Sequence, residues 1–460
     1  MARFSRRGFL KTTCCTAAGV AAASFSRLGL VSAFAQGSGD YKALVCVFLY
    51  GGNDANNMIV PYDTNGYNNY AKIRAGLAIS KGSLLPIQPK SLGTPFALHP
   101  KMPDLRTLFN GGQVAALVNA GTLVQPTTRD QYLNGQVSVP LNLYSHSDQT
   151  QQMQTAALKS FADVGWGGQV ADRIQAIYGG NFPILISLAG TNVFAEGLVA
   201  RPIEAYGDPT QALSGFYGSS EDNARLAALQ SLLTFDTGLS LIQTASTTTS
   251  NAVKDAKTLA DALAQGSGIT TKFPDTDLGA QLKQVALIIQ VRAALGLPRQ
   301  IFFVATGGYD THSDQLSQHD SLYDNVDKSM SAFYQATVEL GIPQQVMTFT
   351  LSDFGRTFLP DSTSGTDHAW GSHHLIMGGG VAGQDFYGTF PTQVLSGPDD
   401  ATDEGRWIPT TSLDQYGATL AQWFGVQAGD LPAIFPNLQN FSNPILGFAP
   451  SGPKGQARRG

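Results

Sequence analysis

Five short apolar runs, each ending in glycine or polar residues, constrain the fold of this chain more than any other feature. The apolar residues within each run are continuous rather than alternating, which is typical of strands buried on both faces. Strands of this kind occur in parallel sheets that helices cover on both sides. We therefore expect an α/β fold with a mostly parallel central sheet, whose clearest strands lie at 41–50, 113–118, 182–188, 300–305 and 345–351.

Helical patterns separate these runs. The apolar spacing predicts helices over 103–110, 280–297 and 322–340, and Pro298 and Gly341 follow the last two. Alternating strands and helices indicate a doubly wound sheet, which binds its ligands outside the carboxyl ends of the strands.

Two further expectations concern helices. The segment at about 206–276 has helical runs and no strong strand, so we interpret it as a helical insertion or a cap on the sheet. His319 is expected to face solvent from a helix.

The N-terminus has the pattern of an export signal. Residues 5–11, S-R-R-G-F-L-K, form a twin-arginine motif, and the A-F-A at 33–35 predicts cleavage after Ala35. Arg27 and several polar residues interrupt the apolar stretch between them, so no stable membrane anchor is expected. We therefore expect residues 1–35 to be a signal peptide, the twin-arginine export machinery to be a partner, and the mature protein to be periplasmic or extracellular.

The composition of the exported chain excludes some function classes. Loss of the signal leaves 24 Lys and Arg against 34 Asp and Glu, a formal net charge of −10, so nucleic acid is not an expected partner. Cys46 becomes the only cysteine, which excludes an intrachain disulfide, and its apolar neighbours predict that it is buried. About 425 residues allow one large α/β domain or two smaller ones. The tail at 455–460 is expected to be disordered.

The stretch 352–380 contains the side chains that a metal site needs. It holds three of the seven histidines, His368, His373 and His374, with Asp367 among Gly and Ser residues. A carboxylate and an imidazole from one short loop suit zinc, manganese or iron, so we interpret this stretch as half of a metal-centred site. The alternative is a surface loop whose histidines are incidental.

The other half of the site is expected at two more strand ends. Asp310 and His312 follow the run at 300–305, and the paired glycines before them permit a turn that brings both to one metal. Asp54 follows the first run in the same way, after Gly-Gly-Asn. The alternatives are a helix cap at Asp310 and a tight turn at Asp54.

Candidates for the remaining catalytic groups are weaker. Ser145 and Ser147 lie where a helix is expected to begin, and the helix dipole there favours an attacking oxyanion or a bound phosphate or sulfate. The alternative is an N-cap at Ser147 or Asp148. Arg356 follows the run at 345–351 and could bind an anion through two hydrogen bonds, or form a salt bridge to Asp353.

Taken in order, these motifs resemble a large family of exported bacterial proteins known as DUF1501. The resemblance extends from residue 41 to about 438, and its carriers are F-L-Y-G-G-N-D-A-N-N at 48–57, the segment 98–121, Y-S-H-S-D-Q-T-Q-Q-M-Q-T at 144–155, G-G-Y-D-T-H-S-D-Q at 307–315, and S-D-F-G-R-T-F followed by G-T-D-H-A-W-G-S. This family is similar to a branch of the alkaline phosphatase and sulfatase superfamily. The resemblance implies a three-layer α/β/α sandwich over 36–454 with a site of one or two divalent metals, namely zinc, manganese, calcium or magnesium.

The resemblance also implies which residues hold the metals. This sequence departs from the superfamily pattern in two places, because Asp310 and His312 are only two apart and Asp54 follows Gly-Gly-Asn instead of ending its strand. The implied ligands are Asp54, Asp310, His312, Asp367 and His368, completed by His373 or His374.

Two functions from different classes are compatible with these motifs. The first is an exported metal-dependent hydrolase acting on a phosphate or sulfate ester of an anionic small molecule or glycan. No cysteine lies in a C-x-P-x-R context, so formylglycine chemistry is not expected. The second is a non-catalytic periplasmic protein of the same fold that binds an anionic glycan or a protein partner, since no nucleophile is evident beyond Ser145 and Ser147.

Overall fold

The computed structural model describes residues 41–180, 182–205, 218–235 and 238–449. The chain divides into two units, Met1–Tyr41 and Lys42–Gly460. The expected signal peptide, its cleavage site and the tail at 455–460 lie outside the described residues. The described helices and strands all belong to the second unit.

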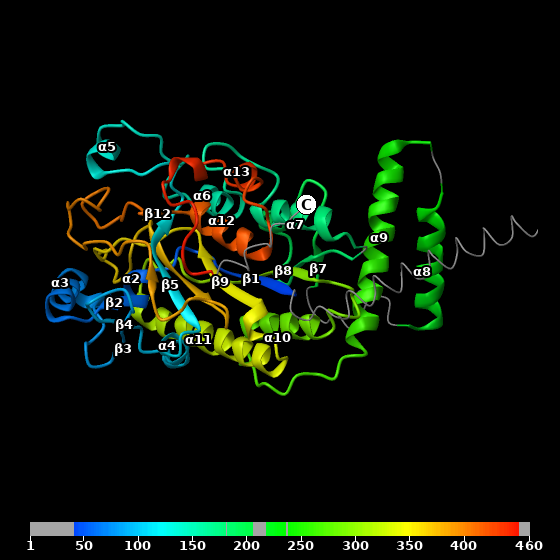
Figure 1. Cartoon of the computed structure of the whole chain (residues 1–460), viewed down its shortest axis with the longest axis horizontal. Coiled ribbons are helices and arrows are strands. Elements are labelled where there is room, and N and C mark those ends of the chain that lie inside the picture. The colour runs from blue at the N-terminus through cyan, green and yellow to red at the C-terminus, as the bar shows by residue number, and fades with distance from the viewer. Residues whose placement is uncertain (1–40, 181, 206–217, 236–237, 450–460) are drawn as a thin grey trace, which may run out of the picture. The chain divides into compact units, whose positions relative to one another are not determined.

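A nine-stranded sheet forms the centre of this unit (Figure 1). Its strand order is β11-β5-β10-β9-β1-β8-β6-β7, and β12 pairs with β5. Each of the five predicted apolar runs forms a strand, and Cys46 is fully buried in the first of them, as expected. The strands are β1 (Lys42–Leu49), β5 (Val114–Gly121), β6 (Leu185–Ser187), β7 (Ile203–Glu204), β8 (Arg299–Thr306), β9 (Val346–Ser352), β10 (Ser372–Met377), β11 (Phe386–Tyr387) and β12 (Thr411–Ser412).

Helices cover both faces of the sheet (Figure 1). On one face lie α4 (Pro103–Asn110), α10 (Asp277–Gln290) and α11 (Gln315–Glu339). On the other lie α6 (His146–Thr155), α7 (Trp166–Tyr178) and α12 (Leu413–Phe424). The prediction of a three-layer α/β/α arrangement with a mostly parallel sheet is confirmed. Smaller elements include α2 (Ala55–Met58), α3 (Thr64–Arg74), α5 (Arg129–Leu133), α13 (Leu431–Ile434) and a small sheet of β2 (Ile59–Pro61), β4 (Phe96–Leu98) and β3 (Leu85–Ile87).

One strand of the central sheet runs against the others. β10 is antiparallel to both of its neighbours, β5 and β9, whereas β1 is parallel to β8 and β9. The connection from β9 to β10 contains no helix, so the chain returns beside β9 instead of crossing over the sheet. As a result His373 and His374 lie inside a buried strand rather than in the loop that the sequence suggested.

Two helix predictions were wrong at their ends. α10 ends at Gln290 instead of 297. The prediction ran too far because Leu295 and Leu297, which are buried in the turns after the helix, continue its apolar spacing. α11 begins at Gln315 instead of 322, because its polar first turns still bury one face, through Gln315 and His319. His319, expected to face solvent, is fully buried there.

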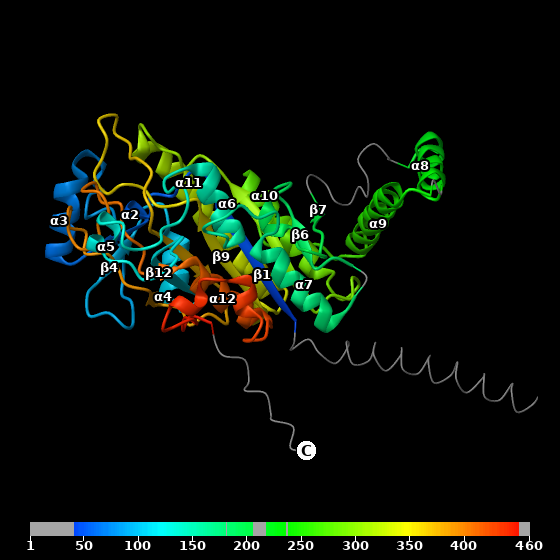
Figure 2. The same ribbon diagram turned by 90° about the horizontal axis from the view of Figure 1, so that it is seen from above.

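The segment 206–276 contains two of the helices, α8 (Ser220–Leu233) and α9 (Ser240–Leu263). They stand beyond the β7 edge of the sheet in both views (Figures 1 and 2). Among the described residues, no helix combines the length and apolarity needed to cross a membrane.

Three neighbouring strands bring their carboxyl ends to one place. Leu49 at the end of β1 is in register with Thr306 of β8 on one side and with Ser352 of β9 on the other. The loops that follow these strands carry Asp54, Asp310 and Asp353, so the sheet gathers polar side chains at this edge.

Candidate metal centre

The turn after β1 fits closely against the loop after β8. Gly51 has a φ of +116°, and a Cβ at this position would lie 2.4 Å from the backbone nitrogen of Asp310. Only glycine satisfies both conditions, because other residues are strained at this φ and would collide with the neighbouring backbone. This close contact fixes the position of the Asp310 backbone relative to the turn after β1.

Three imidazoles converge on the carboxylate of Asp310. Its Oδ1 lies 2.9 Å from Nε2 of His312 and 3.3 Å from Nε2 of both His146 and His368. The Nε2 of His368 is also 3.0 Å from the Nε2 atoms of His146 and His312. His146 begins α6, His312 follows β8, and His368 lies between β9 and β10, so segments far apart in the chain contribute one ring each.

An acceptor faces the other nitrogen of each ring. Nδ1 of His146 lies 2.8 Å from Oδ2 of Asp353, and Nδ1 of His368 lies 2.8 Å from the carbonyl oxygen of Tyr144. Nδ1 of His312 lies 3.3 Å from Oδ1 of Asp367. A carbonyl or an ionised carboxylate only accepts hydrogen bonds, so Nδ1 of His146 and Nδ1 of His368 each carry a proton, and each of these two rings in its neutral form directs its Nε2 lone pair into the cluster.

This arrangement fits a divalent metal. Two Nε2 lone pairs 3.0 Å apart repel each other unless a proton or a cation lies between them. Imidazoles whose Nδ1 is held by a carboxylate or a carbonyl are typical of metal ligands. The ligand atoms of His146, Asp310 and His368 all lie within 4.8 Å of one another. This mixture of nitrogen and oxygen suits zinc or manganese better than calcium or magnesium, which favour oxygen.

A second group of ligands adjoins the first. His312, Asp361 and Asp367 also place one ligand atom each within 4.8 Å of the others. His312 contacts the first group through Nε2 and Asp367 through Nδ1. The chain therefore offers ligands for one metal or for two adjacent metals.

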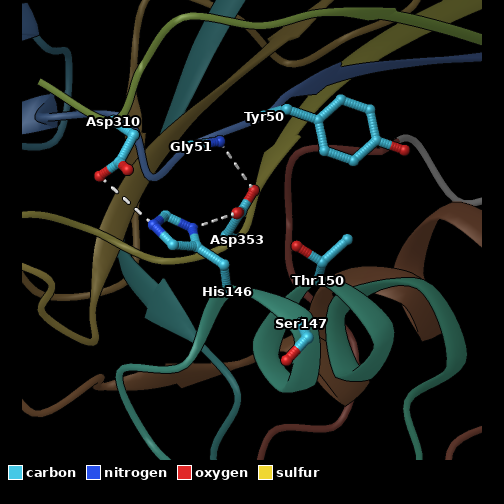
Figure 3. A pocket seen from close by; sticks show the side chains of 7 residues that line it. All are labelled: Tyr50, Gly51, His146, Ser147, Thr150, Asp310 and Asp353. Carbon is cyan, nitrogen blue, oxygen red and sulfur yellow. Dashed lines mark hydrogen bonds and ion pairs between the residues drawn. The ribbon is translucent and has the colours of Figure 1, made fainter.

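A cavity of about 410 Å³ opens beside these ligands (Figure 3). His146 and Asp310 belong both to its wall and to the ligand cluster. The rest of the wall is formed by Tyr50, Gly51, Ser147, Thr150 and Asp353. Desolvation raises the pKa of Tyr50 to about 12, so its ring is a neutral surface of the cavity at physiological pH.

Arg356 stabilises the charge of the central carboxylate. Its side chain is fully buried, and its Nη1 donates to Oδ1 of Asp310 over 2.7 Å. Desolvation opposes the ionisation of Asp310, but the hydrogen bond and charge of Arg356 outweigh it and lower the pKa of Asp310 to about 2. The alternative of a salt bridge to Asp353 is wrong, since that carboxylate instead accepts from Gly51 and contacts His146.

Asp54 lies outside both groups of ligands. It is fully buried, forms an ion pair with Arg74, and accepts a hydrogen bond from Gln315. Desolvation opposes its ionisation, but the charge of Arg74 together with hydrogen bonds from Asn56 and Arg74 and the nearby His319 lowers the pKa of Asp54 overall. It also caps α2 by accepting from the backbone of Asn56, so its oxygens serve the turn after β1.

The two histidines of β10 also lie outside both groups. Nδ1 of His373 accepts from the backbone nitrogen of Asn119 over 2.9 Å, and the ring of His374 stacks on Tyr416. Desolvation lowers the pKa of His373 to about 4 and that of His374 to about 3. The structure thus brings together four of the predicted ligands, Asp310, His312, Asp367 and His368.

Sequence reasoning missed His146 and Asp361 as candidate ligands. His146 stands between Ser145 and Ser147, which drew attention to their hydroxyls. The hydroxyl of Ser145 donates to Asp148 over 2.6 Å, while Ser147 lines the cavity. A histidine in the first turn of a helix after a polar loop is the signal that could have found His146.

Comparison with known proteins gives one family match and several distant structural matches. The model of a family described as "protein of unknown function (DUF1501)" matches residues 41–400. No curated protein matches the sequence.

Similar solved structures share little sequence with this chain. A protein of the alkaline phosphatase superfamily from Vibrio parahaemolyticus is 11% identical, with 85% of this chain and 68% of that chain covered and a TM-score of 0.30. The PsFucS1 sulfatase from Pseudoalteromonas sp. is 8% identical, with 75% and 64% covered and a TM-score of 0.29. The alkaline phosphatase from the Antarctic bacterium TAB5 is 10% identical, with 74% and 92% covered and a TM-score of 0.24. Similarity at this level carries no argument about activity.

Proposed function

The chain belongs to the DUF1501 family, and we propose that it is a metal-dependent hydrolase of the alkaline phosphatase and sulfatase type that acts on a phosphate or sulfate ester. The observation that carries the proposal is the convergence of three imidazole Nε2 atoms on Asp310 at the wall of a cavity. Each ring also has its Nδ1 against an acceptor, which is how proteins orient histidines toward a metal.

His146, Asp310 and His368 would hold the first metal, and His312, Asp361 and Asp367 a second one. A bound divalent metal supplies Lewis acidity, which polarises an ester oxygen and favours ionisation of an attacking hydroxyl.

The surrounding residues keep these ligands ready to bind. Asp353 holds the proton of His146 on Nδ1, and the Tyr144 carbonyl does the same for His368. Arg356 keeps Asp310 ionised, which preserves a negative ligand at the centre of the cluster. Arg356 therefore acts through Asp310 in this proposal, rather than by binding the substrate.

Ser147 is the better placed of the two predicted hydroxyls. It lines the cavity next to His146, in the first turn of α6, where the helix dipole stabilises an oxyanion. Its Oγ donates a hydrogen bond to Oδ2 of Asp148 over 3.3 Å, which holds the hydroxyl at the cavity wall. Ser145 donates to the same carboxylate and does not line the cavity.

Export completes the proposal. The twin-arginine motif at 5–11 predicts transport of the folded chain, which suits a protein that takes up its metal before it leaves the cytoplasm. The substrate would then be a periplasmic or extracellular ester of a small anionic molecule or glycan.

The test is turnover by protein purified without chelator. A panel of aryl phosphates, phosphodiesters and sulfates is assayed before and after chelation, with wild type, Asp310→Ala and the control His374→Gln, whose ring lies outside both ligand groups. We expect turnover that chelation and Asp310→Ala abolish and that the control retains. Absence of turnover, together with binding of an anionic glycan that chelation does not affect, would instead identify the non-catalytic alternative.

A further inference from the structure

The described wall of the cavity beside the candidate metal centre carries carboxylates but no lysine or arginine. Among the described residues that line it, the acidic side chains are Asp310 and Asp353, and none is Lys or Arg (Figure 3). Asp353 is held at the wall by the backbone nitrogen of Gly51 and by His146. A substrate that enters this cavity therefore meets two carboxylates.

The two arginines nearest the ligand cluster are occupied by other partners. Arg356 has no exposed side-chain surface, and all three of its guanidinium nitrogens donate to Asp310, Gly51 or Thr366. Arg406 donates from Nε to the carbonyl of His368 over 2.7 Å and forms an ion pair with Glu404. Its guanidinium also lies over the ring of Tyr144, 5.1 Å from the centroid. Neither arginine lines the cavity.

The remaining wall offers neutral partners. Ser147 and Thr150 contribute hydroxyls from α6, and Tyr50 contributes an aromatic face on the opposite side (Figure 3). The first turn of α6 adds a partial positive charge of about half an elementary charge. These groups can hydrogen-bond single ester oxygens and contact an apolar substituent, but they add no full positive charge to that of the metals.

Sites that bind dianionic phosphoryl groups use arginine or lysine clamps in addition to metals. Here the proposed metals would supply the full positive charge, and no Lys or Arg among the described wall residues adds to it, so a dianion would bring one more negative charge close to Asp310 and Asp353. Resting on the proposed function, we infer that the site selects esters whose reacting group carries a single negative charge, a phosphodiester or a sulfate ester, over the dianionic phosphate monoester. The neutral ring of Tyr50 at the wall offers an apolar contact for the second substituent of a diester.

Three probes with one leaving group test this inference on the metal-loaded full chain at pH 8. They are p-nitrophenyl phosphate, which is a dianion at this pH, methyl p-nitrophenyl phosphate, which differs from it by one methyl group and one charge, and p-nitrophenyl sulfate. We expect kcat/KM for one of the two monoanions to exceed that for the dianion by at least about tenfold. Comparison of kcat/KM for methyl p-nitrophenyl phosphate with that for p-nitrophenyl sulfate shows which monoanion is the substrate.

A pair of variants separates charge from intrinsic reactivity. Thr150→Lys places a cation at the cavity wall, and Thr150→Met provides a side chain of similar length without charge. The ratio of kcat/KM for p-nitrophenyl phosphate to that for methyl p-nitrophenyl phosphate should rise about tenfold in Thr150→Lys relative to Thr150→Met, because the leaving group and the metals are the same.

The outcomes distinguish the two proposals. Preference of the wild type for p-nitrophenyl phosphate, or an equal ratio in the two Thr150 variants, overturns the inference and leaves the proposed hydrolase standing. Failure to turn over any of the three probes in the presence of zinc or manganese overturns both.

Discussion

At the level of single residues, the orientation of each imidazole in the candidate centre is set by the atom that faces its Nδ1. Asp353 illustrates this best, because one oxygen accepts from Gly51 over 3.1 Å and the other lies 2.8 Å from Nδ1 of His146. The carboxylate is almost completely buried, so water does not replace these contacts. The tautomer of His146 thus depends on a residue that is not itself a ligand.

The variant Asp353→Asn tests this dependence. Its amide oxygen can still accept from Gly51, but its NH₂ group then faces Nδ1 of His146 and favours the tautomer whose Nε2 is protonated. We expect the metal dissociation constant to rise about 10–100-fold. Competition with a chromophoric chelator measures this change, and the exposed Asp163→Asn is the matched control. An unchanged dissociation constant in Asp353→Asn would contradict the role given to Asp353.

At the level of elements, the site depends on how the turn after β1 meets the loop after β8. β1 lies between β8 and β9 in the sheet. Its register with both strands fixes the position of the turn after β1 along the strand direction. Gly51 then lies directly against the backbone of Asp310. The positions of the ligands therefore follow from strand register and from one residue without a side chain.

Gly51→Ala is expected to damage both stability and the metal centre. The φ of +116° strains any L-residue, and the new Cβ would lie 2.4 Å from the nitrogen of Asp310. We expect a loss of at least about 1–3 kcal/mol in the free energy of unfolding, together with weaker metal binding, because the loop must move. Gly76→Ala is the control, since an added Cβ there meets nothing within 4 Å. Denaturant titration and metal titration of both variants measure the two effects, and parallel behaviour of the two variants would refute this reasoning.

At the level of the whole molecule, the main β-strands and the three-layer arrangement could be predicted because they depend on local patterns. Continuous apolar runs identify buried strands, and Asp310, His312, Asp367 and His368 follow such runs or lie in glycine-rich loops. The composition of the centre could not be predicted in full, because it depends on which loops the sheet brings together. Three strands, β6, β7 and β8, separate His146 from Asp310 in the chain, and no local pattern shows that α6 ends up beside β9. His373 and His374 were predicted as ligands because the sequence alone does not show that they lie inside a buried strand.

Global stability should also respond to pH through a buried acid. Asp414, in the first turn of α12, accepts a hydrogen bond from the backbone of Asn437, yet desolvation dominates and raises its pKa to about 7. The folded state therefore binds this proton more tightly than the unfolded state, whose pKa is the ordinary 3.8. Between these two values stability falls as pH rises, and above about pH 7 the full cost of the buried charge is present.

Asp414→Asn removes this titration while its amide oxygen can keep the bond to Asn437. We expect the difference in unfolding free energy between pH 5 and pH 8 to shrink by roughly 1–3 kcal/mol in the variant. Urea unfolding at the two pH values measures it, and an equal pH difference in wild type and variant would contradict the assignment. Asp327, whose pKa desolvation also raises to about 7, should retain its own contribution in both proteins.

Metal titration of wild type and His146→Ala by calorimetry is the sharpest test of the proposed metal centre, because His146 is the candidate ligand that the fold, rather than the sequence pattern, supplies. With zinc or manganese added to the metal-free full chain, we predict at least one bound metal per wild-type chain and at least about a hundredfold weaker binding to His146→Ala. His373→Asn, which alters a buried histidine outside both ligand groups, should bind as the wild type does. Equal affinity of wild type and His146→Ala, or loss of binding in His373→Asn alone, would contradict the assignment of this centre.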